Sequence, residues 1–124
     1  MISPLAYVDK EARIGANVTI HPFAYIDKNV EIGDNCTIMP YASILSGTRM
    51  GTDNIIYQGA IIGATPQDFK FKGEDTLLKI GNHNTIREKV ILNRGTNTTD
   101  CTIIGDGNFL LEGVHLAPDT HLGS

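Results

Sequence analysis

The sequence predicts an all-β protein that folds as a parallel β-helix, and three observations support this prediction. Aliphatic residues recur at every sixth position, small or β-branched residues follow most of them four positions later, and Gly often stands directly after them. Aromatic residues make up only 6% of the chain and Trp is absent, so the core must be built from Ile, Val and Leu. Such residues suit narrow, repeated layers better than a globule organised around large rings.

The period of six begins at Ile2 and keeps one phase to Leu122. Of the 21 positions in this register, 18 are aliphatic or Met, and the exceptions are Asp68, Glu74 and Thr98. Six residues of α-helix would rotate the side chain by about 240°, so an amphipathic helix could not keep these residues on one face. On an extended strand, every sixth side chain faces the same way. We therefore expect short strands joined by corners, with three hexads in each coil of about eighteen residues.

The register also predicts how the coils stack. Each large aliphatic should lie on its equivalent in the next coil, as in the series Ile2, Ile20, Ile38 and Ile56. The small residues four positions later fit a narrow interior. Gly, Asn and Asp tolerate positive φ, so the glycines that directly follow the aliphatics are predicted to form tight corners. These glycines are Gly15, Gly33, Gly51, Gly63, Gly81, Gly105 and Gly123.

Composition and charge exclude several classes of protein. A net charge of −4 and a pI near 5.4 argue against a nucleic-acid-binding protein, which normally has a basic face. The sequence has no apolar run long enough to cross a membrane, and it does not begin with a secretory signal. Cys36 and Cys101 are too few and too far apart for a disulfide framework or a zinc cluster. We therefore expect a cytoplasmic protein without a metal or a cofactor.

Two polar stretches interrupt the period and are predicted to leave the β-helix as loops, at about 64–79 and about 93–103. In the first, the register positions are Asp68 and Glu74, and the segment contains Pro and Gly. Function in repeat proteins concentrates where the repeat is broken, so we expect the functional residues there. The whole chain, 1–124, is predicted to be a single β-helix domain.

Basic residues concentrate around these interruptions. Residues 63–94 contain six of the ten Lys and Arg residues against four acidic residues, whereas the remaining chain has four basic and ten acidic residues. A basic region on an acidic protein favours an anionic partner, such as a phosphate group or an acidic carrier protein. The alternative is a solvated loop of ordinary charge.

The interruptions and the hexads beside them contain three motifs. They read Gln67-Asp68-x-Lys70-x-x-Gly73-Glu74-x-Thr76, then Ile80-Gly81-x-x-Asn84-x-Ile86-Arg87-Glu88, then Arg94-Gly95-Thr96. Together with the hexads, they resemble the UDP-N-acetylglucosamine acyltransferases of lipid A biosynthesis, from the first residues to about Asp119. The resemblance implies transfer of a 3-hydroxyacyl group from acyl carrier protein to the 3-hydroxyl of UDP-N-acetylglucosamine. It also implies cytoplasmic homotrimers of left-handed β-helices, against the usual right-handed preference of parallel crossovers, with active sites between subunits.

The resemblance gives roles to three residues of the first interruption. Gln67, Asp68 and Lys70 match loop residues that contact the sugar and acyl group of the substrate. Asp68 would accept a hydrogen bond from a hydroxyl or amide of the ligand. Lys70 would offer a compact positive charge to an anionic group or a carbonyl. Without the resemblance, each would be interpreted as a surface residue.

The last motif contains the catalytic positions that the resemblance implies. The family pattern is a His, two residues, a second His and then an Asp. His115 matches the first His, which positions the substrate, and Asp119 matches the acid. The second His is the family's general base, but this sequence has Pro118 there, and Pro cannot take a proton from the sugar hydroxyl as a neutral imidazole would. His121 lies half a hexad further on and is expected to project from a different part of the coil.

The family continues with further coils and a helical C-terminal domain, which this sequence does not contain. Together with Pro118, this difference predicts an incomplete or impaired acyltransferase. One alternative is a non-catalytic, trimeric hexapeptide-repeat protein that binds a ligand or acts as a scaffold. Another is a different hexapeptide transferase or a γ-type carbonic anhydrase. The zinc of the latter needs three His ligands, and His83, His115 and His121 do not form an obvious set.

Overall fold

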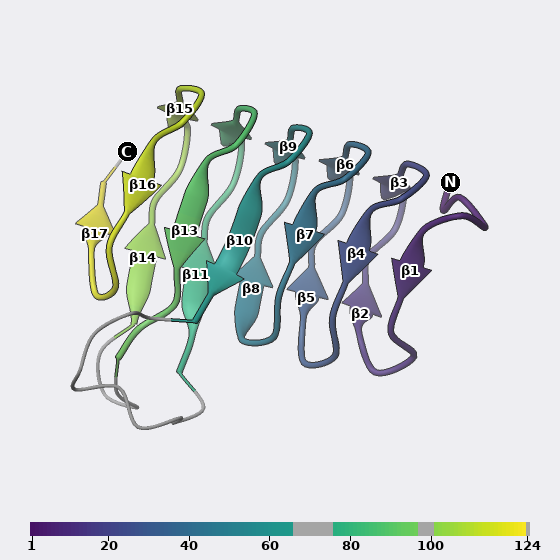
Figure 1. Cartoon of the computed structure of the whole chain (residues 1–124), viewed down its shortest axis with the longest axis horizontal. Coiled ribbons are helices and arrows are strands. Elements are labelled where there is room, and N and C mark those ends of the chain that lie inside the picture. Colours follow the sequence, from purple (N-terminus) through teal and green to yellow (C-terminus); the bar gives the residue numbers. More distant parts are fainter. Residues whose placement is uncertain (66–75, 97–100, 124) are drawn as a thin grey trace.

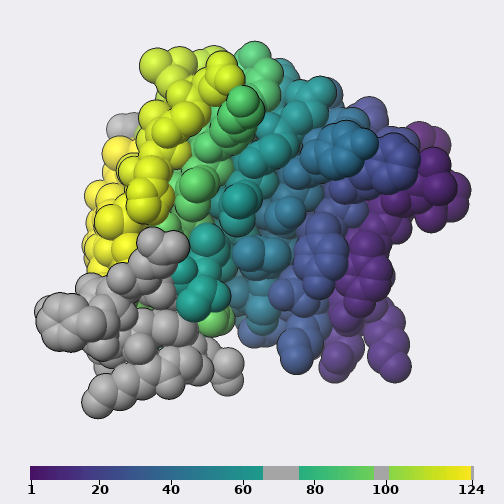
Figure 2. Space-filling model, in the orientation of Figure 1, coloured from purple at the N-terminus to yellow at the C-terminus, as the bar shows by residue number. Residues whose placement is uncertain are grey.

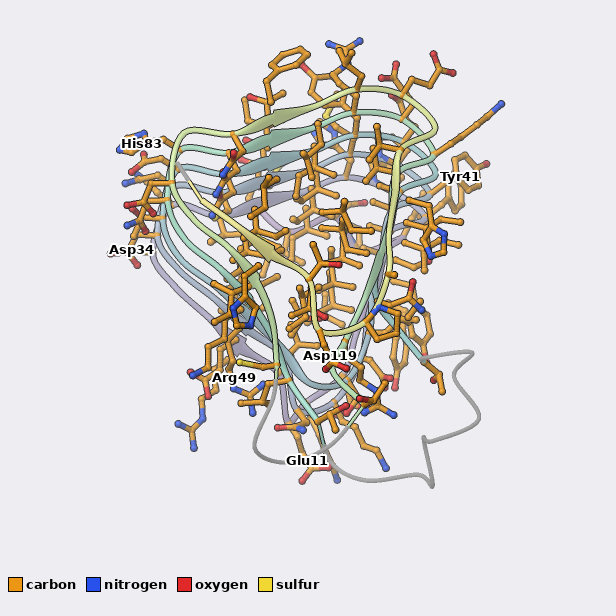
Figure 3. All side chains as sticks on the ribbon, turned by 90° about the vertical axis from the view of Figure 1, so that its left-hand side faces the viewer. Glu11, Asp34, Tyr41, Arg49, His83 and Asp119 are labelled. Atoms are coloured by element: carbon orange, nitrogen blue, oxygen red, sulfur yellow. The ribbon has the colours of Figure 1, made fainter. Side chains whose placement is uncertain are left out.

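The chain winds into a parallel β-helix in the computed structural model, which describes residues 1–65, 76–96 and 101–123 (Figure 1). The strands of this part are two to four residues long, and it contains no helix, hence none that could cross a membrane. Successive strands belong to three different parallel sheets. Figure 3, which looks along the molecule, shows three walls that enclose inward-pointing side chains. The all-β prediction is confirmed.

The three sheets are built from every third strand. Sheet 1 contains β1 (Tyr7–Val8), β4 (Tyr25–Ile26), β7 (Ser43–Ile44), β10 (Ile61–Ala64), β13 (Ile91–Asn93) and β16 (His115–Leu116). Sheet 2 contains β2 (Arg13–Ile14), β5 (Glu31–Ile32), β8 (Thr48–Met50), β11 (Leu78–Ile80), β14 (Thr102–Ile104) and β17 (His121–Leu122). Sheet 3 contains β3 (Thr19–Ile20), β6 (Thr37–Ile38), β9 (Ile55–Ile56), β12 (Thr85–Ile86) and β15 (Phe109–Leu110).

The predicted stacking of equivalent aliphatics is confirmed. Ile2 bridges to Ile20, Ile20 pairs with Ile38, and Ile38 pairs with Ile56, so each of these coils contains eighteen residues. Ile20, Ile38 and Ile56 are completely buried in the hydrophobic core. Burial of one such side chain stabilises a fold by roughly 1.5–3 kcal/mol. The stacked columns therefore explain how a chain with few aromatic residues forms a core.

The backbone at the corners differs from the prediction. The residue with positive φ stands three positions after the register aliphatic, as in Asn17, Tyr41 and His83. Among the described glycines that directly follow an aliphatic, Gly63 alone has positive φ. The prediction that these glycines supply the left-handed corner residues was therefore wrong for all the others.

Gly33 shows why Gly is required directly after the aliphatic. A Cβ atom at Gly33 would lie 2.6 Å from the carbonyl oxygen of Gly51 in the next coil. The backbone of the next coil would also lie 2.9 Å from a Cβ atom at Gly15 or Gly81. A side chain at these positions would push adjacent coils apart. At Gly15, Gly33 and Gly81, glycine therefore serves the stacking of the coils and not the turn.

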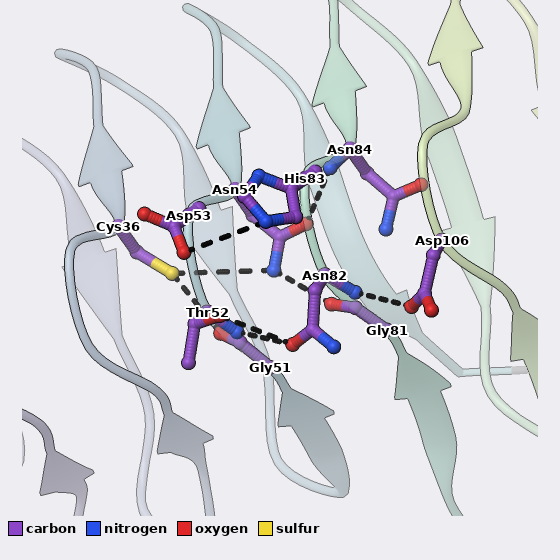
Figure 4. Close-up of polar contacts among 10 residues, drawn as sticks. All are labelled: Cys36, Gly51, Thr52, Asp53, Asn54, Gly81, Asn82, His83, Asn84 and Asp106. Carbon is purple, nitrogen blue, oxygen red and sulfur yellow. Dashed lines mark hydrogen bonds and ion pairs between the residues drawn. The ribbon is translucent and has the colours of Figure 1, made fainter.

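A ladder of buried asparagines lines the corner between sheet 2 and sheet 3 (Figure 4). Asn54 donates from Nδ2 to the carbonyl oxygen of Gly81 and accepts from the N–H of Asn84, both at 2.8 Å. Asn84 repeats this arrangement one coil later, donating to Gly105 at 2.8 Å and accepting from the N–H of Asn108 at 2.7 Å. These residues stand at the small position of the hexad. Asn is tolerated in the core there because both ends of its amide are paired.

Cys36 occupies the same position one coil before Asn54. Its side chain is completely buried, and Sγ donates to the carbonyl oxygen of Gly51 at 3.1 Å. Burial raises the pKa of the Cys36 thiol, so the thiol stays neutral. This cysteine is therefore a core residue and not a reactive nucleophile.

Both interruptions leave the β-helix at one corner, between sheet 1 and sheet 2. We call it the insertion corner; in uninterrupted coils it is the turn that joins β1 to β2, β4 to β5, β7 to β8 and β16 to β17. Ile56 pairs with Ile86, 30 residues later, and Ile86 pairs with Leu110, 24 residues later, instead of 18. The additional residues fall between β10 and β11 and between β13 and β14. All additional chain is thus attached along one edge of the prism.

Candidate functional site

The last turn of the insertion corner brings together His115, Pro118 and Asp119. β16 ends with the pair His115–Leu116, and Leu116 packs against the core, so the side chain of His115 faces outward. Pro118 and Asp119 form the turn that follows, and Figure 3 labels Asp119 there. The three residues predicted from the first interruption lie outside the described residues: Gln67, Asp68 and Lys70. Their roles stay predictions.

His115 is held by a buried amide. Its Nε2 atom lies 2.7 Å from Oδ1 of Asn93, the last residue of β13. Asn93 is only 4% exposed, and its Nδ2 donates to the carbonyl oxygen of Thr65 at 3.1 Å. Thr65 follows β10 directly, at the start of the first interruption. His115, Asn93 and Thr65 therefore form a chain of contacts across three neighbouring coils of sheet 1.

The contacts from Thr65 through Asn93 to His115 determine the tautomer of the His115 ring. The carbonyl oxygen of Thr65 can only accept a hydrogen bond, so the amide nitrogen of Asn93 must face it. The amide oxygen of Asn93 then faces His115, and Nε2 of the ring must carry a hydrogen. In the neutral ring, Nδ1 is therefore left with its lone pair. No described residue hydrogen-bonds to Nδ1, and the His115 side chain is exposed to solvent.

Asp119 makes hydrogen bonds to residues of two other segments at the insertion corner. Its Oδ1 accepts a hydrogen bond from the N–H of Thr96 at 2.9 Å, and its Oδ2 accepts one from the Thr96 hydroxyl. Its own N–H donates to Oγ1 of Thr102 at 2.9 Å. Within the described part, no hydrogen bond joins Asp119 to His115. Asp119 therefore holds residues on both sides of the second interruption, Thr96 through its carboxylate and Thr102 through its backbone N–H.

Pro118 fits its local backbone. It precedes Asp119, whose φ is +64°, in the turn formed by residues 117–120. A turn with positive φ at its third residue favours Pro at its second, because the ring presets the required φ. The Thr120 hydroxyl closes the turn by donating to the carbonyl oxygen of Ala117 at 2.7 Å. Pro118 is thus well accommodated, although it has no group that could take a proton.

The two histidines of this end of the chain lie in different sheets. His121 begins β17 in sheet 2, where it pairs with Ile103, whereas His115 pairs with Ile91 in sheet 1. Nε2 of His121 lies 3.0 Å from the carbonyl oxygen of Cys101. The expected separation of His121 from the rest of the motif is what the structure shows.

His83, His115 and His121, which a zinc-binding γ-type carbonic anhydrase would need as ligands, do not lie close together in the structure. His83 lies at the corner between sheet 2 and sheet 3, with Nε2 3.8 Å from a carboxylate oxygen of Asp53 (Figure 4). His115 and His121 lie on the two sides of the insertion corner. In residues 1–65, 76–96 and 101–123, no three His, Cys, Asp or Glu side chains are placed to hold a metal ion. This geometry does not support a γ-type carbonic anhydrase.

Sequence reasoning missed the role of Asn93. Its only sequence signal is its place directly after Leu92, where Gly stands in many other hexads. The bulge in β10, where the register shifts between Ile62 and Ala64, pairs Ala64 with Asn93. This brings the amide beside the start of the first interruption. No local pattern reports such a contact across 28 residues of chain.

Known proteins with similar sequences decide the family. The model of the bacterial transferase hexapeptide family (six repeats) matches residues 11–38 and 29–64. The whole chain is 50% identical to the acyl-[acyl-carrier-protein]–UDP-N-acetylglucosamine O-acyltransferase of Janthinobacterium sp. (strain Marseille), of which it covers 48%. It is 42% identical to the protein of the same name from Thermodesulfovibrio yellowstonii, of which it covers 46%.

Solved structures agree with these relatives. A UDP-N-acetylglucosamine acyltransferase from Bacteroides fragilis matches the whole chain with a TM-score of 0.97 at 56% identity, and the chain covers 49% of it. The chain belongs to the UDP-N-acetylglucosamine O-acyltransferase family. A second member, from Acinetobacter baumannii, matches 99% of the chain with a TM-score of 0.96 at 39% identity, and 48% of it is covered.

Family membership completes the description of the fold. The β-helix is left-handed, as the resemblance predicted. The chain spans about half the length of the curated family members it matches.

Proposed function

We propose that the chain acts in acyl transfer from acyl carrier protein to UDP-N-acetylglucosamine. In this proposal a 3-hydroxyacyl group moves to the 3-hydroxyl of the sugar, the first step of lipid A biosynthesis, in the cytoplasm. The observation that supports it is the insertion corner, where His115 contacts the end of β13 and Asp119 contacts Thr96, which lies just before the second interruption. Asn93 at the end of β13 in turn contacts Thr65, at the start of the first interruption. A site for a large polar ligand needs polar groups that converge beside a rigid wall, and the stacked strands supply that wall.

The proposed substrate contacts come from the first interruption. Gln67, Asp68 and Lys70 are proposed to bind the sugar and the acyl group. Among the described basic residues of this region, Arg87 is already engaged: its Nε lies 2.9 Å from Oε1 of Glu88, and its guanidinium stacks on the Tyr57 ring. Arg87 is therefore not proposed to bind the anionic substrate.

Turnover is proposed to be impaired. The position of the family's general base is occupied by Pro118, which has no titratable group. The family pattern gives His115 a role in positioning the substrate, and Asp119 is proposed to have the supporting role of anchoring the turn. A general base contributes about 100-fold to 10,000-fold to the rate of such reactions, which sets the size of the expected impairment.

The proposal includes a homotrimer. Tyr7, Tyr25 and Ile61 lie in one row on the outer face of sheet 1, with Ser43 between Tyr25 and Ile61, and the three are 50%, 42% and 36% exposed. Figure 2 views the molecule from this face. The rings of Tyr7 and Tyr25 stack with their centroids 5.0 Å apart. A row of exposed apolar side chains favours a protein partner over water, and a second copy of the chain is the proposed partner.

The test is acyl transfer from 3-hydroxyacyl carrier protein to UDP-N-acetylglucosamine by the purified chain and by Pro118→His. We expect the variant to raise kcat/KM by about 100-fold or more. Pro40→His is the matched control, since Pro40 also precedes a residue with positive φ, Tyr41, but at another corner. It should leave the rate unchanged. If Pro118→His and Pro40→His behave alike, position 118 is not the base site of this chain.

A second candidate function is a non-catalytic binding or scaffold protein. The observation that favours it is that Pro118 fits its turn and that both carboxylate oxygens of Asp119 are bound to Thr96. Such a protein would show a rise in Tm with UDP-N-acetylglucosamine, but no acyl transfer in the wild-type chain. Turnover by the wild-type chain would eliminate this candidate.

A further inference from the structure

We infer that His115 is the proton acceptor of this chain, an inference that rests on the proposed acyl transfer. The family pattern gives this position a supporting role and assigns proton transfer to the position of Pro118. In this chain the imidazole that remains in the motif is that of His115, and its surroundings are those of an oriented base.

The orientation comes from Asn93. Its Oδ1 lies 2.7 Å from Nε2 of His115, and its own rotation is determined by the 3.1 Å hydrogen bond from Nδ2 to the carbonyl oxygen of Thr65. Asn93 is buried, at 4% exposure, whereas the His115 ring is exposed. A base whose second nitrogen donates to a fixed carbonyl oxygen is the arrangement found in cysteine proteases with a Cys-His-Asn set. The Asn93 carbonyl would also stabilise the imidazolium that forms when Nδ1 takes a proton.

His121 is less suited to this role. Its Nε2 also donates to a carbonyl oxygen, that of Cys101, but its ring stands on the outer face of sheet 2. His115 lies on sheet 1, the same wall as the ends of β10 and β13 that lead into both interruptions. The partner of His115 is a buried side chain, whereas Cys101 is half-buried.

The proposed step conserves atoms and charge. The 3-hydroxyl of the sugar gives its proton to Nδ1 of His115 while its oxygen bonds to the carbonyl carbon of the acyl thioester. The carbonyl π electrons move to the oxygen and form the tetrahedral intermediate. When the intermediate collapses, the carbon–sulfur bond breaks, its electron pair goes to sulfur, and the proton on Nδ1 passes to that thiolate. The products are the ester and the free thiol of the carrier, and His115 is neutral again.

The first test measures the tautomer directly by nitrogen NMR of the histidine side chains at a pH where they are neutral. We expect His115, identified by loss of its signals in His115→Gln, to be the Nε2–H tautomer. Asn93→Leu should remove this bias while leaving the signals of His83 and His121 unchanged. A predominant Nδ1–H tautomer in the wild-type chain would overturn the inference whatever the activity of the protein.

The second test is kinetic. His115→Gln should lower kcat by about 100-fold, with KM for UDP-N-acetylglucosamine within about threefold of wild type, and His121→Gln should change neither. In the Pro118→His background the new imidazole takes the proton, so adding His115→Gln should cost less than about tenfold. A purely structural His115 would cost the same in both backgrounds, and that result would overturn the inference.

Binding of UDP-N-acetylglucosamine, measured by calorimetry, separates the inference from the proposed function. A wild-type chain that binds the sugar nucleotide but shows no turnover overturns the base role of His115 and leaves the binding role. A chain that turns over and loses less than about tenfold in His115→Gln overturns the inference and leaves the acyltransferase. A chain that neither binds nor turns over overturns the proposed function itself.

Discussion

The N–H of Thr96 donates a 2.9 Å hydrogen bond to Oδ1 of Asp119, which lies 23 residues later in the chain. Thr96 is buried, with 4% exposure, so its N–H would have no solvent partner if the carboxylate were removed. Asp119 also has a φ of +64°. One residue therefore supplies both the turn of the insertion corner and the anchor of the chain before the second interruption.

Substitutions at Asp119 separate these two contributions. Asp119→Gly tolerates the positive φ but leaves the Thr96 N–H unpaired, so it should lower the free energy of unfolding by about 1–3 kcal/mol. Asp119→Asn keeps an oxygen acceptor and a residue that accepts this backbone, so it should cost under about 1 kcal/mol. Urea unfolding measures both. Equal losses in the two variants would show that the hydrogen bond to Thr96 contributes nothing.

Gly33→Ala tests the close contact between coils. The new Cβ would lie 2.6 Å from the carbonyl oxygen of Gly51, which belongs to the backbone and cannot rotate away. We expect a loss of about 1–3 kcal/mol in the free energy of unfolding. Gly123→Ala is the matched control, because no described residue other than its chain neighbours lies within 4 Å of its added Cβ. A Gly33→Ala protein as stable as Gly123→Ala would contradict this account of the glycines.

The asparagine ladder is expected to contribute to stability through Asn54. Asn54→Ala leaves the buried N–H of Asn84 and the carbonyl oxygen of Gly81 without these partners, which should cost about 2–4 kcal/mol. Asn108→Ala is the control in the same column, since among the described residues its side chain makes one hydrogen bond, of 3.4 Å, to the carbonyl oxygen of Asp106. Thermal unfolding of both variants compares them. A larger loss at Asn108 than at Asn54 would contradict the ladder.

The carboxylate of Asp9 should titrate below the ordinary pH for Asp. Hydrogen bonds from the N–H of Glu11 and from the Tyr7 hydroxyl, both at 2.9 Å, lower the pKa of Asp9 from its usual 3.8. Because the folded-state pKa is lowered, ionised Asp9 contributes stability above the unfolded value, and this contribution is lost as the pH falls through the folded value. Tyr7→Phe removes one donor and keeps a ring that can stack on Tyr25.

Carbon NMR of the Asp9 carboxyl checks this prediction. The pKa of Asp9 should rise toward 3.8 in Tyr7→Phe, because one hydrogen bond to the charged form is lost. Tyr25→Phe keeps the Tyr7 hydroxyl and should leave the titration of Asp9 unchanged. If Tyr7→Phe has no effect on the midpoint, the hydroxyl does not donate to the carboxylate in solution.

Much of the fold could be predicted because the repeat is local. The spacing from Ile2 to Ile20 to Ile38 predicts both where the strands lie and which residues pair, since equivalent hexads of successive coils stack on one another. The conformation of the corners could not be predicted from composition alone. Gly tolerates positive φ, but it also permits close approach of the backbone of a neighbouring coil. The sequence shows a glycine in both cases and does not distinguish them. At Gly33 the structure shows the second use.

Less of the candidate site could be predicted. The departure at Pro118 and the match of His115 and Asp119 to the motif are visible in the sequence, whereas their hydrogen-bond partners are not. Asn93 and Thr96 lie 22 and 23 residues before the residues they contact. These distances along the chain depend on how many residues the second interruption adds, which no hexad pattern specifies.

The sequence by itself determined that this protein is a stack of hexapeptide coils with two interruptions, because one apolar phase along a whole chain is compatible only with extended repeats. It also predicted, from the resemblance, that the position of the family's general base holds Pro118, a residue unable to accept a proton. Only the tertiary structure decided that both interruptions leave at one corner, that Asp119 is bound to Thr96, and that Asn93 selects the tautomer of His115. The physical reason is that stacking brings into contact residues of different coils, and hydrogen-bond geometry in those contacts is set by the stack and not by neighbours in sequence.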